Sequence, residues 1–330
     1  MSLHNIRLEV MKTMEKSVDS FIDKYLIPVE KIWQPSDFLP DSRQDTFMDE
    51  VHELREVSKE LPYDFWVVLV GDTVTEEALP TYESWLMDVE GINQKEGSPW
   101  AKWIRNWTGE ENRHGDVLNK YLYLSGRVNM REVEITTQYL LNDGFDPGTD
   151  RDPYKNFVYT AFQELATNIS HKRVGKLAAD KGNVLLSKMC KIIAGDEMRH
   201  HLAYKEFVNE IFKYDPSEMM LAFADMMKKK IVMPAQLIKQ TGEHMENTYV
   251  EFANAAQRLG VYTAQDYINI LRRLIEGWDL PNITELDDAA EKARDYLCKL
   301  PDRLQRVTDR MVIETKRQLF TWVSPEGIMT

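Results

Sequence analysis

Apolar residues recur every three to four positions along most of the chain, and this spacing predicts long amphipathic helices. The alternation of apolar and polar residues that indicates β-strands is almost absent. No glycine-, serine- or proline-rich linker, repeat or low-complexity tract divides the sequence. We therefore expect an all-α protein whose residues 1–330 form a single domain.

Two of the predicted apolar stripes are interrupted by the same polar pair, Glu-x-x-His. The first stripe steps through Ile104, Trp107, Glu111, His114, Leu118 and Tyr121. The second steps through Ile193, Glu197, His200, Tyr204, Phe207 and Ile211. Both pairs should point inward, where a carboxylate is costly unless it is paired, protonated or bound to a cation. A metal ion would satisfy the carboxylate and the imidazole together.

Each pair also has an ordinary interpretation. Thr108 and Glu111 fit a capping box, which would make Glu111 a helix-start residue. Ser98 followed by Pro99 is a better start and leaves Glu111 inside the helix. A single Glu-x-x-His is common by chance, and a single histidine on an apolar face is more often a packed core residue. Two copies on separate apolar faces are much less ordinary.

Two further helices offer the remaining ligands of a dinuclear site. Four-helix carboxylate proteins add one inward glutamate from each of two helices to two Glu-x-x-His pairs. Glu164 lies in a segment with Asp152 as N-cap and a proline at the first helical position, although it could also be an exposed helical residue. Glu76 and Glu77 precede Pro80, which has no amide for the carbonyl of Glu76, so the helix should loosen there. Spacing alone does not choose between these two glutamates.

Charge determines the kind of ion. Two close carboxylates repel by about 4 kcal/mol at about 4 Å with an effective dielectric constant of about 20. Four glutamates therefore need two divalent cations to be tolerated in a bundle core. Oxygen-rich ligation with two imidazoles favours iron or manganese over a structural zinc. The sequence thus predicts a dinuclear, redox-capable metal centre.

The residues around every proposed ligand resemble the soluble acyl-acyl-carrier-protein desaturases, the stearoyl-type enzymes of plastids and their bacterial relatives. The resemblance covers most of the chain. It is carried by residues 32–41 (IWQPSDFLPD), 68–72 (VLVGD), 76–82 (EEALPTY), 110–116 (EENRHGD), 120–128 (KYLYLSGRV), 162–164 (FQE), 196–200 (DEMRH), 221–227 (LAFADMM) and 256–262 (AQRLGVY).

The resemblance implies a fold and a ligand set. We expect a ferritin-like four-helix bundle over about residues 60–215, with an N-terminal segment, 1–59, and C-terminal helices, 216–330, packed on it. The implied ligands of two iron ions are Glu76, Glu111, His114, Glu164, Glu197 and His200. Glu76 and His114 would serve one iron, Glu164 and His200 the other, and Glu111 and Glu197 would bridge them.

The resemblance also assigns residues outside the ligand set. Asp196 should hold the ring of His114, and Trp33 should contact Asp196 and form a route for electrons from the surface. Thr167 matches a family hydroxyl near the dioxygen side of the cluster. A helix threonine that bonds back to a carbonyl is an equally ordinary interpretation of Thr167.

The implied activity is the insertion of a cis double bond into a saturated fatty acyl chain carried by acyl carrier protein. Dioxygen would be the oxidant, ferredoxin the electron donor, and the enzyme a homodimer. Five residues fall near family positions that line the acyl tunnel, although each could be ordinary packing or loop: Trp85, Val89, Pro147, Thr149 and Phe157. Trp85 is bulkier than we expect there, which leaves the acyl length and the double-bond position open.

Composition excludes several classes of protein. The mean hydropathy is −0.46, and no apolar run approaches the roughly 18 residues of a membrane span. The chain has seven histidines and lacks the histidine boxes of membrane-bound desaturases. A net charge of −13 opposes nucleic-acid binding. Because acyl carrier protein and ferredoxin are acidic, local basic patches should dock them. The candidates, which could equally be solvated faces, are Lys228–Lys229–Lys230, Arg272 with Arg273, and Lys188 with Lys191.

Two cysteines, Cys190 and Cys298, do not suggest a disulfide scaffold and favour a reducing compartment. We expect a bacterial cytoplasm, or a plastid stroma if a transit peptide precedes this sequence. Two other dinuclear carboxylate proteins stay as alternatives. One is a ferritin-like iron-storage protein or oxidase, and the other is a ribonucleotide reductase subunit with Tyr121 or Tyr204 as its radical residue.

Overall fold

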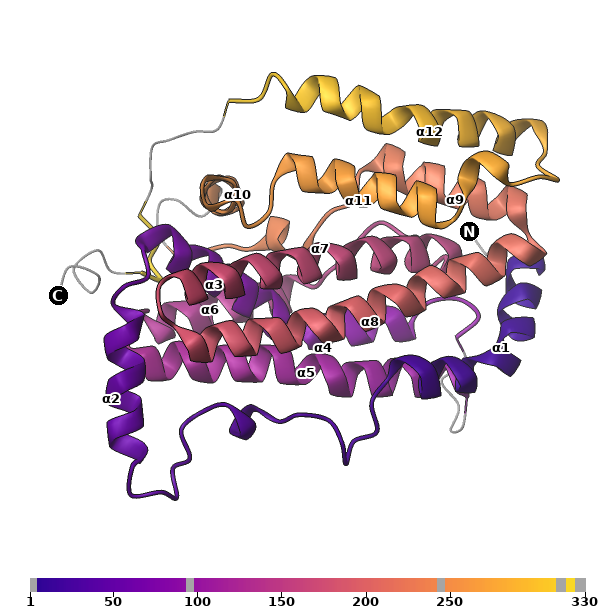
Figure 1. Cartoon of the computed structure of the whole chain (residues 1–330). Helices are drawn as coiled ribbons and strands as arrows, with labels where there is room; N and C mark the ends of the chain where they lie inside the picture. The colour runs from indigo at the N-terminus through magenta and orange to yellow at the C-terminus, as the bar shows by residue number, and fades with distance from the viewer. Residues whose placement is uncertain (1–4, 93–97, 242–246, 313–318, 324–330) are drawn as a thin grey trace.

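Four long helices form the centre of the computed structural model, which describes residues 5–92, 98–241, 247–312 and 319–323. They are α3 (Tyr63–Glu77), α5 (Pro99–Ser125), α7 (Pro153–Asp180) and α8 (Val184–Tyr214). Figure 1 shows α5, α7 and α8 running side by side along the length of the molecule. The described residues contain no strand, which confirms the all-α prediction.

Capping residues set where the bundle helices begin and end. Asp152 accepts a hydrogen bond from the Tyr154 amide at 2.9 Å, and Pro153 opens α7. Ser98 is the N-cap of α5, as the sequence predicted, so Glu111 lies well inside that helix. Helix α3 ends at Glu77, and α4 (Leu79–Met87) begins after one intervening residue with a proline in its first turn. The expected loosening near Glu76 is therefore a complete break between two helices.

N-terminal elements pack around one side of the bundle. Helix α1 (Asn5–Tyr25) lies against α5 and α8, and α2 (Phe47–Ser58) lies against α5. Helix α6 (Met130–Asp143) packs on α3. An extended segment joins α1 to α2 and carries η1 (Pro35–Asp37), as Figure 1 shows along the lower edge. This segment brings Trp33 to the bundle.

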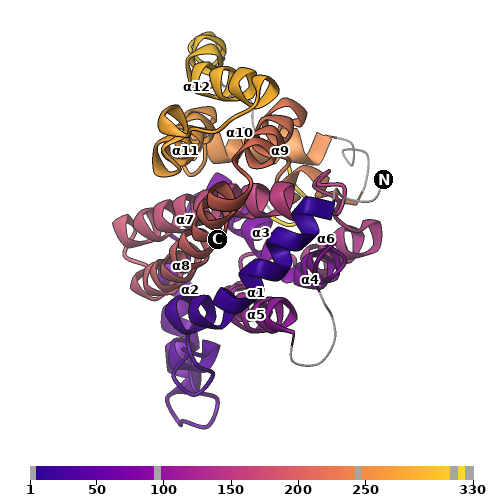
Figure 2. The ribbon, with the colours of Figure 1, turned by 90° about the vertical axis from the view of Figure 1, so that its right-hand side faces the viewer.

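The C-terminal helices form a second layer over α7 and α3, seen at the top of Figure 2. Its elements are α9 (Pro216–Lys229), η2 (Pro234–Leu237), α10 (Thr248–Leu259), α11 (Ala264–Gly277), η4 (Leu280–Asn282) and α12 (Asp288–Thr308). Helix α10 crosses α3 where Gly71 has no side chain, and a Cβ there would overlap the ring of Phe252. The absence of a side chain at Gly71 therefore lets α10 approach α3.

The two apolar stripes that carry the Glu-x-x-His pairs are buried. Ile104, Trp107, Leu118 and Tyr121 on α5 are at most 4% exposed. Ile193, Tyr204, Phe207 and Ile211 on α8 are at most 1% exposed. The periodicity therefore identified the inward faces of both helices. None of the described helices has the length and apolar character that a membrane crossing requires.

Candidate metal centre

Six side chains from the four bundle helices meet in two overlapping groups. In each group, one potential ligand atom per residue lies within 4.8 Å of all the others. The first group is Glu76, Glu111, His114 and Glu197, and the second is Glu111, Glu164, Glu197 and His200. Glu111 and Glu197 belong to both groups. This geometry can hold two metal ions that share two carboxylates.

The two adjacent glutamates at the end of α3 have different surroundings. Glu76 belongs to the cluster, whereas Glu77 does not, and the side chains of Asn119 and Thr137 near Glu77 oppose the rise that burial causes in its pKa. Gly115 on α5 faces the end of α3, and a Cβ there would lie 3.0 Å from the Glu76 backbone carbon. A glycine at this position therefore lets Glu76 approach His114, whose Nδ1 lies 3.8 Å from Glu76 Oε2.

Both imidazoles are fully buried and turn their Nδ1 atoms toward the glutamates. The Nδ1 atom of His114 lies 3.3 Å from Glu197 Oε1 and 3.4 Å from Glu111 Oε2. The Nδ1 atom of His200 lies 2.6 Å from Glu111 Oε1 and 3.6 Å from Glu164 Oε2. The inward nitrogens and oxygens thus face common points between the helices.

Five of these inward atoms are buried and have no hydrogen-bond partner among the residues that the structure describes. They are Glu111 Oε1, His114 Nδ1, Glu164 Oε2, Glu197 Oε1 and His200 Nδ1. Buried polar atoms without a partner are rare and costly in proteins. The atoms are all of ligand type and converge on the same space, so the residues fit a pair of divalent cations.

The outer nitrogens of the two imidazoles are held by carboxylates from the opposite helix. Asp196 Oδ2 on α8 lies 3.3 Å from His114 Nε2, and Glu110 Oε2 on α5 lies 2.9 Å from His200 Nε2. A carboxylate at Nε2 fixes the tautomer and leaves Nδ1 free to bind a metal. Asp196 lies where the sequence placed it, whereas the position of Glu110 was not foreseen.

Two arginines complete this outer arrangement. Arg113 Nη2 donates to Asp196 Oδ2 at 3.1 Å, and Arg199 Nη2 donates to Glu110 Oε2 at 2.8 Å. Burial alone would raise the pKa of Asp196, but the imidazole of His114 and the guanidinium of Arg199 hold it below its usual value. The pKa of Glu110 is lowered against burial in the same way, by His200 and Arg199. Both outer carboxylates are therefore ionised.

Trp33 and Thr167 each contact this centre. The Nε1 atom of Trp33 donates to Asp196 Oδ2 at 2.8 Å, and its ring lies 4.2 Å from the guanidinium carbon of Arg113. The hydroxyl of Thr167 lies 2.6 Å from Glu197 Oε2 and 3.0 Å from the carbonyl of Glu164. The structure therefore contains a contact for each interpretation of Thr167: a hydroxyl beside the cluster and a helix threonine bonded back to a carbonyl.

Electrostatics favour positive charge inside the cluster. Burial would lower the pKa of His114 and His200, but the surrounding carboxylates raise it well above its usual value. Burial raises the pKa of Glu76 to about 7 and that of Glu164 well above its usual value. Four carboxylates cannot stay charged together in an apolar core without compensating positive charge, which two divalent cations would supply.

Two further contacts hold the terminal glutamates, and neither was predicted. His171 Nε2 on α7 lies 2.9 Å from Glu76 Oε1, and Trp107 Nε1 on α5 donates to Glu164 Oε1 at 3.0 Å. Trp107 lies one turn before Glu111 on the same stripe. His171 carries no repeated pattern, so it could not be found from the sequence.

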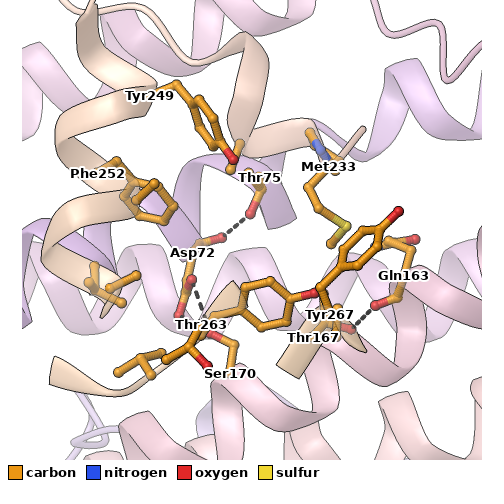
Figure 3. Close-up of a pocket in the computed structure, with 18 of the residues that line it drawn as sticks. Asp72, Thr75, Gln163, Thr167, Ser170, Met233, Tyr249, Phe252, Thr263 and Tyr267 are labelled. Carbon is orange, nitrogen blue, oxygen red and sulfur yellow. Dashed lines mark hydrogen bonds between the residues drawn. The ribbon is translucent and has the colours of Figure 1, made fainter. Parts of the chain in front are cut away.

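A cavity of about 440 Å³ opens beside the cluster. Glu76, Glu111, Trp107 and Thr167 form part of its wall. Figure 3 shows Tyr249 and Phe252 of α10 on one side, with Thr263 and Tyr267 at the start of α11 below. The remaining wall is largely apolar and includes Val68, Leu79, Ala166, Met233, Ala256, Ile268, Leu304, Val307 and Met311. The cavity therefore leads from the end of α12 to the metal-ligand cluster.

The five residues expected to line an acyl tunnel are not part of this cavity wall. Trp85 donates from Nε1 to Thr149 Oγ1 at 3.2 Å and packs edge-on against Phe145 and Tyr159. Val89 and Pro147 are also buried, and the ring of Phe157 packs on Trp100. Tyr82, which does line the cavity, packs against Phe145. Tyr82 thus separates the cavity from an aromatic cluster around Trp85.

The helical architecture and the carboxylate–histidine cluster define a protein of the bundle type that can hold metal ions. A sequence profile described as fatty acid desaturase matches residues 6–324. The chain belongs to this fatty acid desaturase family.

Named relatives agree with this assignment. The chain is 49% identical to the chloroplastic stearoyl-acyl-carrier-protein 9-desaturase of Gossypium hirsutum over 97% of this chain and 80% of that protein. It is 47% identical to the chloroplastic palmitoyl-acyl-carrier-protein 4-desaturase 3 of Ophrys sphegodes over 99% of this chain and 84% of that protein. A crystal structure of a putative acyl-ACP desaturase, DesA2 from Mycobacterium tuberculosis, superposes with a TM-score of 0.52 at 18% identity, covering 86% of this chain and 99% of that one. The last comparison supports the fold alone.

Proposed function

We propose that this protein is an acyl-acyl-carrier-protein desaturase that introduces a cis double bond into a saturated fatty acyl chain. One observation carries the proposal: Glu76 and Glu111, which belong to the two overlapping ligand groups, form part of the wall of a mostly apolar cavity. An alkyl chain in this cavity would lie directly beside the cluster. The relatives named above act on acyl chains carried by acyl carrier protein, and they are similar to this chain over nearly its whole length.

Two iron ions would occupy the cluster. Glu76 and His114 would hold one, Glu164 and His200 the other, and the two shared glutamates would bridge them. When bound, such a pair supplies the oxidation of unactivated C–H bonds by dioxygen. Dioxygen accepts four electrons and becomes two water molecules. Two electrons and two protons leave adjacent methylenes, and ferredoxin supplies two more electrons while two protons come from solvent.

The side chains of this protein position the reactants. Asp196 and Glu110 orient the two imidazoles, and Arg113 and Arg199 keep those carboxylates charged. The Trp33 ring bridges the N-terminal segment to Asp196 and would carry electrons toward the cluster. The hydroxyl of Thr167, which already contacts Glu197, would hold or move a proton at the carboxylate oxygen.

Two lysines of the Lys228–Lys230 run already contact other side chains of this protein, which weakens the case for this run as the docking site of the acidic partners. Lys229 forms ion pairs with Asp150 and Asp225, and the ammonium of Lys228 lies 5.5 Å from the ring centroid of Tyr296. Reversal of Lys228 and Lys230 to glutamate should weaken binding of the carrier protein in a salt-dependent manner if this run is the docking site. Unchanged affinity at low salt would remove this run from the proposal.

We also propose a reducing compartment, either a bacterial cytoplasm or a plastid stroma. Both Cys190 and Cys298 are free thiols in the structure. A reducing environment keeps such thiols from pairing between molecules.

The direct test is to incubate iron-loaded protein with reduced ferredoxin and a mixture of saturated acyl carrier proteins. Mass spectrometry then locates any new double bond. We expect one saturated chain to lose two hydrogens at a defined position, and no product in the absence of dioxygen. Failure to convert any acyl chain would contradict the proposed function.

The alternative functions are not favoured. An iron-storage protein needs no elongated apolar cavity beside its metal ligands, and this cavity is a principal feature of the site. The hydroxyls of both candidate radical residues are already engaged: Tyr121 with Ser58 and Asn183, and Tyr204 with Trp103. A stable tyrosyl radical in an electron paramagnetic resonance spectrum would favour the reductase alternative. Uptake of many irons per chain would favour storage.

A further inference from the structure

The chain leaves the end of α1 beside α5 and α8 (Figure 1), and there its backbone contacts the outer groups of the metal centre. The amide of Ile27 donates to Glu110 Oε1 at 2.5 Å. The guanidinium of Arg199, which also donates to Glu110, donates from Nη1 to the Tyr25 carbonyl at 2.6 Å. Because Glu110 orients His200, this short stretch of backbone acts on one of the two imidazoles.

A second contact lies further along the same segment, at Trp33. The Trp33 carbonyl accepts from Arg113 Nη1 at 3.0 Å, and the Trp33 indole donates to Asp196. Asp196 in turn orients His114. Each half of the centre thus receives the same two contacts from residues 25–33: an N–H for its outer carboxylate and a carbonyl for its arginine.

The carboxylate of Glu110 depends on the Ile27 amide for one of its two oxygens. Glu110 Oε2 lies 2.9 Å from His200 Nε2 and accepts from Arg199. At Oε1, the Ile27 amide is the only donor among the residues that the structure describes. A carboxylate with donors at one oxygen alone can turn about its Cγ–Cδ bond. The N–H of Ile27 therefore fixes the plane of Glu110 and, through it, the ring of His200.

The carboxylate of Asp196 has more support. Its Oδ1 atom accepts from Arg199 at 2.5 Å. Its Oδ2 atom accepts from Arg113 and from Trp33, and lies 3.3 Å from His114 Nε2. Loss of the Trp33 bond would leave donors at both oxygens of Asp196, whereas loss of the Ile27 bond would leave a buried oxygen of Glu110 without a partner.

Contacts outside the metal centre hold residues 25–27 in place. The hydroxyl of Tyr25 donates to Glu206 on α8, and Lys24 pairs with the same carboxylate at 2.8 Å. Ile27 precedes Pro28, which restricts its backbone to an extended conformation. The end of α1 and this proline therefore present the carbonyl and the amide in a fixed position.

We propose that the main chain of residues 25–27 is a positioning element for the half of the metal centre that contains His200. The Ile27 amide sets the plane of Glu110, and the Tyr25 carbonyl holds Arg199 against the same carboxylate. The inference rests on the proposed function, because it takes the cluster to hold a pair of iron ions. In the other half, Trp33 has the corresponding place, but its contribution is one of several.

The experiment removes the amide hydrogen of Ile27. Ile27→Pro lacks this donor, and competition with a chelator measures the affinity for ferrous ion. We expect binding about tenfold weaker than in the wild-type protein, at the lower end of the range for groups that orient metal ligands. Trp33→Phe should cause a smaller loss. Mössbauer spectra of the loaded Ile27→Pro protein should change for one iron of the pair and not for the other.

Pairs of substitutions separate positioning from a general disturbance of the fold. In a Glu110→Gln background, Ile27→Pro should weaken iron binding by much less than tenfold, because a neutral amide accepts a weaker hydrogen bond than a carboxylate does. In an Asp196→Asn background it should retain nearly its full effect. Trp33→Phe should show the reverse dependence. Equal effects of Ile27→Pro in both backgrounds would overturn the inference.

Val29→Pro is the matched control. Val29 is 73% exposed, its amide makes no hydrogen bond with the described residues, and it follows Pro28 in a turn that Lys31 closes. This variant should bind iron like the wild-type protein. Replacement of Ile27 by its α-hydroxy acid removes the same N–H without adding a ring, and it should reproduce the tenfold loss.

Wild-type iron affinity in the α-hydroxy acid variant would overturn the inference, even if Ile27→Pro proved too unstable to measure. Failure of the wild-type protein to bind two irons per chain would instead contradict the proposed function. The two failures are distinguishable, because the first concerns only the variants.

Discussion

The metal-ligand cluster and the cavity beside it are held in place by different forces. Most ligands of the cluster are held by a polar second partner, such as Asp196 for His114 and Trp107 for Glu164. The cavity wall is mostly apolar, and its outer part comes from the turn before α11 and the end of α12. The cluster is thus defined by directional contacts, and the cavity by packing.

This difference predicts two kinds of response to substitution. Removal of one charged group from the cluster leaves other buried charges without compensation, so its effects should be large and should include metal loss. Substitution in the cavity wall changes volume or one contact, so its effects should be graded and should appear in selectivity. The predictions below test this division, from the largest expected effect to the smallest.

Loss of a shared ligand should have the largest effect. Glu111→Ala removes a carboxylate from both ligand groups, so we expect iron content to fall from two to less than one per chain. Activity should fall by more than about 100-fold, beyond the range for groups that only support ligands. Metal analysis of the purified protein and product analysis measure both effects.

The control for this variant is Glu77→Ala. This glutamate is adjacent to a cluster residue but lies outside both ligand groups, near Asn119 and Thr137. The Glu77→Ala protein should keep two irons per chain. Equal metal loss in both variants would mean that the substitutions disturb α3 or α5 in general and would contradict the ligand assignment.

Substitution of the outer carboxylates should have an intermediate effect. Asp196→Asn should weaken iron binding by about 10- to 100-fold, because the amide no longer fixes the imidazole and leaves buried arginines uncompensated. Glu110→Gln is the matched change on the other helix. Asp196 accepts from Trp33 as well as from His114 and two arginines, so we expect the larger loss there. Competition with a chelator measures both affinities.

No change in either affinity would show that the outer carboxylates are not needed to orient the imidazoles. A larger loss of iron affinity in Glu110→Gln than in Asp196→Asn would contradict the predicted order of the two effects. Circular dichroism of both variants should be unchanged, since neither substitution alters side-chain volume appreciably.

Substitution of Trp85, behind the cavity residue Tyr82, should change selectivity by a smaller factor. Trp85→Leu removes the ring that packs on Phe145 and Tyr159, so longer acyl chains should gain by about tenfold over the preferred chain in kcat/KM. Iron content should stay at two per chain. Trp85→Phe, which keeps a ring, should shift the preference less. Unaltered chain-length preference in both variants would show that the wall lies elsewhere.

The smallest effect should come from the contact that holds the outer cavity wall. Arg173 of α7 forms two hydrogen bonds with the carboxylate of Asp266, at the start of α11. Burial would raise the pKa of Asp266, but the bonds from Arg173 and Thr263 lower it below its usual value. The ionised carboxylate therefore stabilises the fold above its unfolded-state pKa, and this contribution is lost as pH falls through the lower folded-state value.

Asp266→Asn tests this contribution. We expect the free energy of unfolding to fall by about 1 kcal/mol at about pH 7, a modest value because the side chain of Arg173 is 40% exposed. The difference from the wild-type protein should shrink below about pH 4, where the unfolded-state carboxyl takes up a proton. Urea denaturation of both proteins over this pH range measures the difference in their free energies of unfolding. A difference that is constant with pH would assign the loss to packing.

The sequence predicted the cluster because its signal is local. Two Glu-x-x-His pairs lie on apolar stripes whose burial follows from helical periodicity, and the break before Pro80 marks the end of α3. Glu110 was missed although the signal was present: the stretches EENRH and DEMRH share an acid, a glutamate, an arginine and a histidine at equal spacing. The repeated acid, Glu110 in one stretch and Asp196 in the other, could have been interpreted as the carboxylate that orients each imidazole.

The cavity could not be predicted in the same way. Its residues come from segments far apart in the sequence, and apolar side chains at a cavity wall look like those of the core. Trp85 and Phe157 were expected to line a tunnel. In the structure Trp85 packs on Phe145 and bonds to Thr149, whereas Phe157 packs on Trp100, and their role in a tunnel stays a prediction.

The crossed outer contacts of α5 and α8 have a consequence for assembly. Asp196 on α8 sets the imidazole of α5, and Glu110 on α5 sets that of α8, so neither coordination sphere is complete without the other helix. Packing of α5 against α8 and binding of both metal ions should then occur as one cooperative event. A titration of the empty protein with ferrous ion should be sigmoidal, with singly loaded molecules scarce throughout.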